Sequence, residues 1–69
     1  MIVTTVSELP IVGALVRYVE PSTGRQRIGR IERYLTRGQH KGCAVVRAVG
    51  IDGRRSTVPA RRLHVLLNN

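Results

Sequence analysis

The stretch CAVVRAVGIDGRRSTVPARRLHVLL, residues 43–67, decides the fold of this chain. Residues 43–49 are mostly alanine and valine and predict a strand, and Asp52-Gly53 is a strong hairpin signal before a short returning strand at residues 54–58. Pro59 is well placed to begin one helical turn, which leads to a last strand at residues 63–67. This half of the chain therefore predicts three short strands, with one helical turn before the last.

The N-terminal half is divided in a similar way by turn residues. Residues 11–19 are rich in β-branched side chains and end at a turn cluster, residues 21–24, whereas residues 25–35 end at a polar loop bounded by Gly38 and Gly42. Residues 1–10 predict an N-terminal arm or an edge strand, and residues 68–69 predict a frayed C-terminus. We therefore expect one all-β domain of five strands, residues 11–67.

Residues 24–37 leave a second interpretation open. Their alternation of apolar and polar side chains is poor, and helical spacing places Ile28, Ile31 and Leu35 on one face. Four arginines would then lie on the opposite face. The alternative fold class is α+β, with a helix at about 24–37.

The size and composition of the chain limit what can stabilise it. A domain of 69 residues has a small stability margin, and Cys43 is the only cysteine, so no intrachain disulfide can form. Cys43, His40 and His64 are too few for a four-ligand zinc site, and we expect neither a metal nor a cofactor. Oligomerisation is the remaining way to stabilise a domain of this size, and a homo-oligomer is therefore an open alternative.

No apolar run approaches the roughly 18 residues of a membrane span. The N-terminus also lacks the basic start and cleavage site of a signal peptide. With a lone cysteine, these features predict no membrane partner and a cytoplasmic location.

Two parts of the sequence carry a family resemblance. Gly13-x-x-Val16-Arg17 followed by GRQRIGRI, residues 24–31, resembles the KOW motif of ribosomal proteins and NusG-type transcription factors. Asp52-Gly53 followed by VPARRL, residues 58–63, resembles the end of SH3-like and Tudor-like barrels. The resemblance implies an SH3-like five-stranded small barrel with one short helical turn before the last strand.

In such a barrel, one set of side chains would point inward and another outward. The inward set is Val16, Ile31, Val46, Val58 and Leu63, with Ala14, Ala44 and Ala48 as small fillers. The outward set includes Arg17, Arg30 and Arg47. A register slip of one residue would exchange the two sets.

The same resemblance suggests one family of enzymes as an alternative. These are the plasmid-borne type II dihydrofolate reductases, which are small SH3-like barrels assembled around a pore. Their ligand-contacting VQIYP motif corresponds here to RSTVP, residues 55–59, in which only the proline matches. Because Ser56, Thr57 and Val58 replace the ligand-contacting side chains, this activity is a remote alternative. No nucleophile–base pair or phosphate-binding loop stands out either, and we expect a protein that is not an enzyme.

Charge gives the clearest functional signal. Residues 25–62 carry eleven of the twelve basic residues against only Glu32 and Asp52, and Lys41 is the only lysine. Guanidinium groups pair two phosphate oxygens at once, so this density favours a polyanionic partner. The candidate nucleic-acid-binding residues are Arg25, Arg27, Arg30, Arg33, Arg37, Lys41, Arg54, Arg55, Arg61 and Arg62.

Only Tyr18 and Tyr34 are aromatic, which disfavours base stacking and favours contacts with the phosphate backbone. The leading hypothesis is a small module that binds duplex DNA or structured RNA with little sequence specificity. The alternative is an interaction adaptor or regulator of phage or plasmid type, whose basic surface docks an acidic protein.

Overall fold

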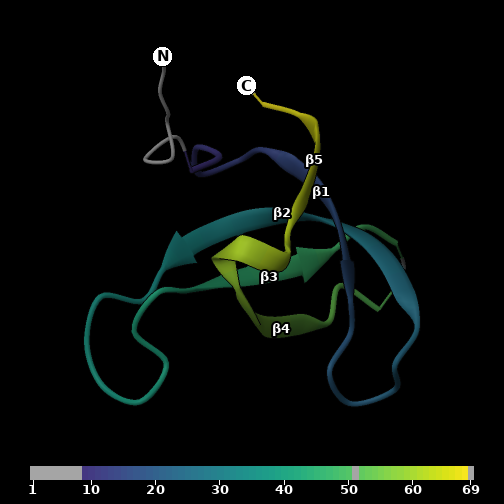
Figure 1. Cartoon of the computed structure of the whole chain (residues 1–69). Helices are drawn as coiled ribbons and strands as arrows, with labels where there is room; N and C mark the ends of the chain where they lie inside the picture. Colours follow the sequence, from purple (N-terminus) through teal and green to yellow (C-terminus); the bar gives the residue numbers. More distant parts are fainter. Residues whose placement is uncertain (1–8, 51, 69) are drawn as a thin grey trace.

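The computed structural model of the chain describes residues 9–50 and 52–68 and is all-β (Figure 1). Its five strands form one antiparallel sheet, and a single 3-10 turn precedes the last strand, which confirms the predicted fold class. The strands are β1 (Leu15–Val19), β2 (Gln26–Tyr34), β3 (Cys43–Ala48), β4 (Arg55–Pro59) and β5 (His64–Leu67), and the 3-10 turn is η1 (Ala60–Arg62).

The helix considered for residues 24–37 is wrong, because most of this segment is the longest strand, β2. β2 pairs with β1 along one edge and with β3 along the other. Backbone pairing on both sides and burial of Gly29 and Ile31 override the helical spacing of the apolar side chains.

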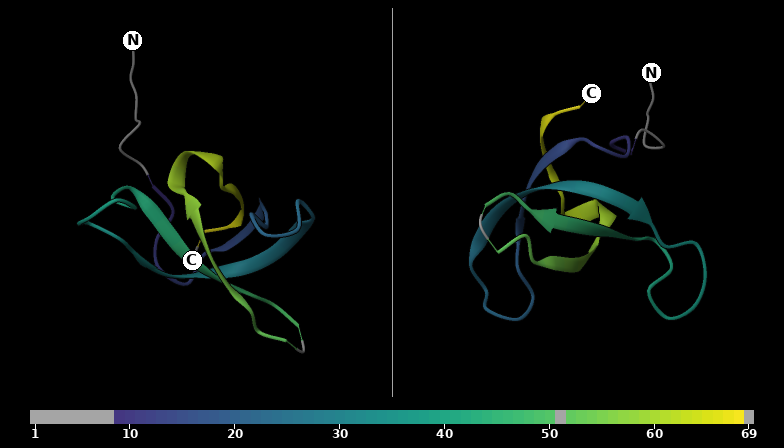
Figure 2. Two further views of the ribbon diagram at one scale, coloured as in Figure 1. Left: turned by 90° about the horizontal axis from the view of Figure 1, so that it is seen from below. Right: turned by 180° about the vertical axis from the view of Figure 1, so that it is seen from behind.

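The sheet is strongly curled (Figure 2). The strand order is β4-β3-β2-β1-β5, so β4 and β5 lie at opposite edges although they are consecutive in the chain. A flat sheet of this order would separate those edges by about 19 Å. Five residue steps from Pro59 to His64 reach about 18 Å even when fully extended, and η1 shortens them. The two edges must therefore bend toward each other.

Within the described residues, no strand pairing joins β4 to β5, so the sheet is open. A closed barrel is not confirmed, and the SH3-like barrel stays a prediction. The five strands and the turn before the last strand do follow the predicted order.

The concave side of the sheet holds the core. The buried cluster consists of Ala14, Val16, Tyr18, Ile31, Ala44, Val46 and Val58, and Tyr34 and Leu63 pack against it while half-buried. Ala48 is buried as well. The predicted inward set is thus confirmed, except that Leu63 lies at the margin of the core.

Hydrogen bonds from or to side chains hold Pro10 and Ile11, in the segment before β1, in place. The Tyr34 hydroxyl donates a hydrogen bond to the carbonyl of Pro10, and the Ile11 backbone N–H donates to the Asn68 side-chain oxygen at 2.9 Å. The prediction of an arm or edge strand falls mostly on residues 1–8, which lie outside the described residues, and residues 9–10 belong to no strand. In the predicted frayed C-terminus, Asn68 is hydrogen-bonded, whereas Asn69 lies outside the described residues.

At Gly29 the backbone of β2 approaches β3 too closely to leave room for a side chain. A Cβ atom at this position would lie 2.5 Å from the carbonyl oxygen of Arg47 and 2.9 Å from Cγ1 of Val46. The first of these neighbours is backbone, which cannot rotate away. Glycine therefore allows the two strands to pair closely at the bend of the sheet.

We predict that Gly29→Ala destabilises the fold by about 1–3 kcal/mol, because the new methyl group forces the paired backbones apart. The midpoint of urea unfolding measures the change. Gln26→Ala, which shortens an exposed side chain on the same strand, is the matched control. Equal midpoints for the two variants would show that the approach at Gly29 is not a constraint.

Candidate nucleic-acid interface

Strand alternation places three arginines side by side on the convex face of the sheet. Arg30 of β2 pairs with Arg47 of β3, and Arg47 pairs with Arg55 of β4. All three side chains are exposed, whereas the residues on both sides of Arg30 and of Arg47 along their strands are buried. Like charges directly opposite each other on neighbouring strands destabilise a sheet. Folding stability therefore does not explain this row.

A β-bulge adds a fourth arginine to the same face. The register shifts between Ile31 and Arg33, so Arg33 pairs with Val45, which lies on the convex side of β3. Without the extra residue, Arg30 and Arg33 would point to opposite faces, because they are three positions apart and successive side chains of a strand alternate.

A fifth arginine on the convex face, Arg17, comes from β1. It pairs with Ile28, whose exposed side chain is also on the convex face. The side chain of Arg30 is positioned nearby by a 2.8 Å hydrogen bond from Nη1 to the Gly13 carbonyl. We call these five residues the arginine face: Arg17, Arg30, Arg33, Arg47 and Arg55.

Sequence reasoning placed Arg17 and Arg47 outward but did not include them among the binding residues. Both lie one position from a buried residue, Arg17 after Val16 and Arg47 after Val46. Arg47 is the one charged residue among residues 43–49, and this was the signal that could have found it. Its position between two other arginines is visible only in the strand register.

Glu32 is the one carboxylate that contacts the arginine face within the described residues. Arg55 donates a hydrogen bond from Nε to Oε1 of Glu32 at 2.7 Å, and Nη1 of Arg47 lies 4.0 Å from Oε2. The bond from Arg55 lowers the pKa of Glu32, and the same bond raises the pKa of Arg55. One carboxylate thus offsets only part of the charge of five arginines.

Arg27 and Arg54 take part in a separate ion-pair network. Arg27 lies on the other face of β2, and its Nη2 donates to both carboxylate oxygens of Asp52 at 3.0 Å. Glu20 lies 3.6 Å from Arg27 and 3.9 Å from Arg54. The hydrogen bond from Arg27 lowers the pKa of Asp52. These two arginines are therefore neutralised by carboxylates of the chain itself.

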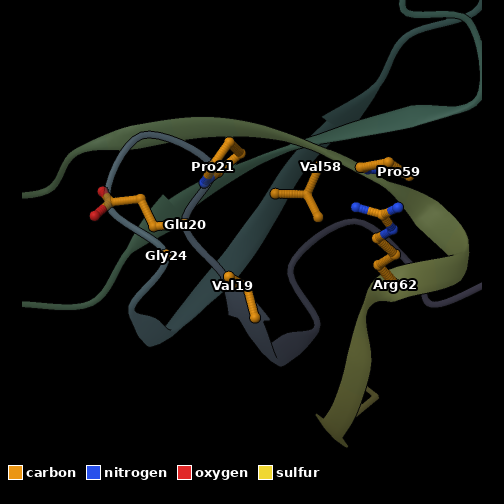
Figure 3. A pocket seen from close by; sticks show the side chains of 7 residues that line it. All are labelled: Val19, Glu20, Pro21, Gly24, Val58, Pro59 and Arg62. Carbon is orange, nitrogen blue, oxygen red and sulfur yellow. The ribbon is translucent and has the colours of Figure 1, made fainter.

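Glu20 is buried, being 1% exposed, where the turn after β1 begins. Thr23 donates a 2.7 Å hydrogen bond to Oε1 of Glu20, and two backbone N–H groups of the turn bond to the Glu20 carbonyl. A hollow of about 470 Å³ separates this turn from the end of β4 and from Arg62. Figure 3 shows the Glu20 carboxylate pointing away from Val58 and Arg62, so the hollow does not hold a converging charge pair.

The remaining predicted binding residues are exposed but do not converge. Arg25 lies in the turn before β2, and Arg37 and Lys41 lie in the loop between β2 and β3, which projects beyond the sheet (Figure 1). Arg61 and Arg62 lie in η1. The length of β4, about 13 Å, separates them from Arg54 and Arg55, so these four arginines do not form one cluster.

Comparison with known proteins gives no family for the chain. No protein-family model matches it, and neither the curated proteins nor the solved structures contain a match. Among residues 9–50 and 52–68, no three potential ligands from His, Cys, Asp and Glu group as a metal site, and no helix is long and apolar enough to cross a membrane.

We predict that stability falls as the pH drops below about 4.5, the ordinary pKa of a glutamate. The pKa values of Glu32 and Asp52 are lower in the folded chain, so their ion pairs contribute fully above their ordinary values and are lost as the pH falls through the folded values. Urea unfolding midpoints along an acid series measure this dependence.

Arg55→Gln should flatten the acid dependence, because it removes the hydrogen bond to Glu32, whereas Arg37→Gln in the projecting loop serves as the control. If the unfolding midpoints of wild type and Arg55→Gln depended on pH in the same way, the Arg55–Glu32 pair would not contribute to the acid dependence of stability.

Proposed function

We propose that this chain is a small nucleic-acid-binding module whose arginine face contacts the phosphate backbone of duplex DNA or structured RNA with little sequence specificity. The observation that carries the proposal is the row Arg30, Arg47 and Arg55 on three adjacent strands. The row is unfavourable in the free protein, and a bound polyanion removes the repulsion.

The spacing of the row suits a phosphate backbone. Adjacent strands lie about 4.8 Å apart, so three arginines span about 10 Å across the sheet. A DNA duplex presents one charge per roughly 1.7 Å of its axis, which is about six phosphates over that distance. Each guanidinium group can pair with two oxygens of one phosphate.

The two tyrosines support backbone contact over base stacking. Tyr18 is buried in the core, and Tyr34 is half-buried with its hydroxyl bonded to Pro10. Burial raises the pKa of both phenols. Since the chain has no Phe, no Trp and no further Tyr, it offers no exposed phenyl, phenol or indole ring to stack on an unpaired base.

We predict a steep salt dependence of binding to duplex DNA. Five phosphate contacts give a slope of about −4.5 in a plot of log affinity against log salt concentration. Fluorescence anisotropy with a short labelled duplex at several salt concentrations measures the slope, and folded RNA is the parallel ligand. A flat response with both ligands would overturn the proposal.

We predict that Arg30→Ala combined with Arg47→Ala weakens duplex binding roughly tenfold or more, because charge-assisted hydrogen bonds are lost. The salt slope should become shallower by about 1.8. The double variant Arg37→Ala with Lys41→Ala removes the same charge from the projecting loop and should bind nearly as wild type does.

Equal losses for the two double variants would show that net charge, rather than the arginine face, determines binding. If neither nucleic acid binds and a protein partner is captured from nuclease-treated lysate, the arginine face docks an acidic protein instead.

A further inference from the structure

The two edges of the sheet differ in chemistry. The β4 edge carries Arg55 and Pro59 and follows Arg54, and charged residues and proline at an edge prevent pairing with another strand. The β5 edge has the sequence HVLL and contains no proline, no arginine, no lysine and no acidic residue. All four residues of β5 are exposed, although three of them are apolar.

The two segments that meet at β5 are almost free of charge, although Arg17 of the arginine face pairs with His64 at the start of β5. Residues 9–16 and 63–69 contain no acidic or basic residue apart from His64, in a chain of net charge +8. The pairing of β1 with β5 and the bond between Ile11 and Asn68 bring these two segments together. The exposed apolar side chains of this uncharged edge are Ile11, Val12, Val65, Leu66 and Leu67.

We propose that the uncharged edge binds a second copy of this chain, with β5 pairing antiparallel to β5 of the partner about a two-fold axis. A two-fold axis places the same patch on both sides of the contact, so the surface needs only to be complementary to itself. Antiparallel pairing satisfies the backbone groups on the open side of β5.

Charge identifies a second copy as the occupant. Two chains of this net charge repel each other, and the β5 edge allows contact without placing arginine against arginine. The arginine face lies on the convex side of the sheet and remains accessible in the pair. A small domain without a disulfide also gains stability from burying this apolar edge. The inference does not depend on nucleic-acid binding.

Sedimentation velocity on the full chain without nucleic acid, over a range of protein concentrations, tests the proposal. We expect a reversible dimer that persists or strengthens at high salt, because salt screens repulsion between the chains. Nucleic-acid binding weakens as the salt concentration rises. The salt dependence therefore distinguishes dimer formation from nucleic-acid binding. A monomer at every protein and salt concentration would overturn the proposal.

Leu66→Lys tests the location of the contact. A charge on the pairing strand enters a two-fold interface twice, and we expect the dimer dissociation constant to rise roughly tenfold or more. Val49→Lys adds the same charge at a valine that is 58% exposed and lies beyond the end of β3, and it should dimerise as wild type does. Equal dissociation constants for the two variants would place the contact elsewhere.

Amide hydrogen exchange on the wild-type chain gives a readout that does not need a folded variant. The amides of residues 64–67 should become more protected as protein concentration rises, whereas those of β4 should not change. Protection of β5 that is independent of concentration, in a chain that sediments as a dimer, would exclude β5 as the interface.

Discussion

The short link between β4 and β5 is the constraint on which the rest of the structure depends. It joins strands at opposite edges of a five-stranded sheet through four residues, of which Ala60–Arg62 form a 3-10 turn. A flat sheet cannot satisfy this link, so the sheet curls. The curl separates a concave side, which holds the core, from a convex side, which carries five arginines.

The curl also explains the small residues of the core. Ala14, Ala44 and Ala48 are buried, and Gly29 lets β2 lie against the β3 backbone with no room for a side chain. A curved sheet brings inward-facing side chains closer together than a flat one does, so large residues at every position would overpack the interior. Tyr18 and Ile31 are the largest apolar side chains of this small core.

Charge is sorted into distinct regions of the surface. Asp52 and the buried Glu20 neutralise Arg27 and Arg54, and Glu32 offsets part of the arginine face. Residues 9–16 and 63–69 contain no acidic or basic residue apart from His64. Because carboxylates and arginines pair locally, the net positive charge is concentrated on the convex face, the projecting loop and η1. This separation allows one surface to attract a polyanion while another remains free of repulsion between copies.

The sequence by itself predicted five strands in the observed order, the helical turn after Pro59 and nearly all of the inward-facing residues, but it left the all-β and α+β classes both open. These follow from local signals: β-branched runs, Asp52-Gly53, and alternation within single strands. Only the tertiary structure decided that residues 26–34 are a strand, because pairing with β1 and β3 outweighs helical spacing.

The tertiary structure also decided which arginines converge. Arg30 and Arg33 share a face because of a bulge, Arg27 is bound by Asp52, and Arg47 lies between Arg30 and Arg55. Strand register and bulges join residues far apart in the chain, and no local pattern in the sequence encodes that pairing.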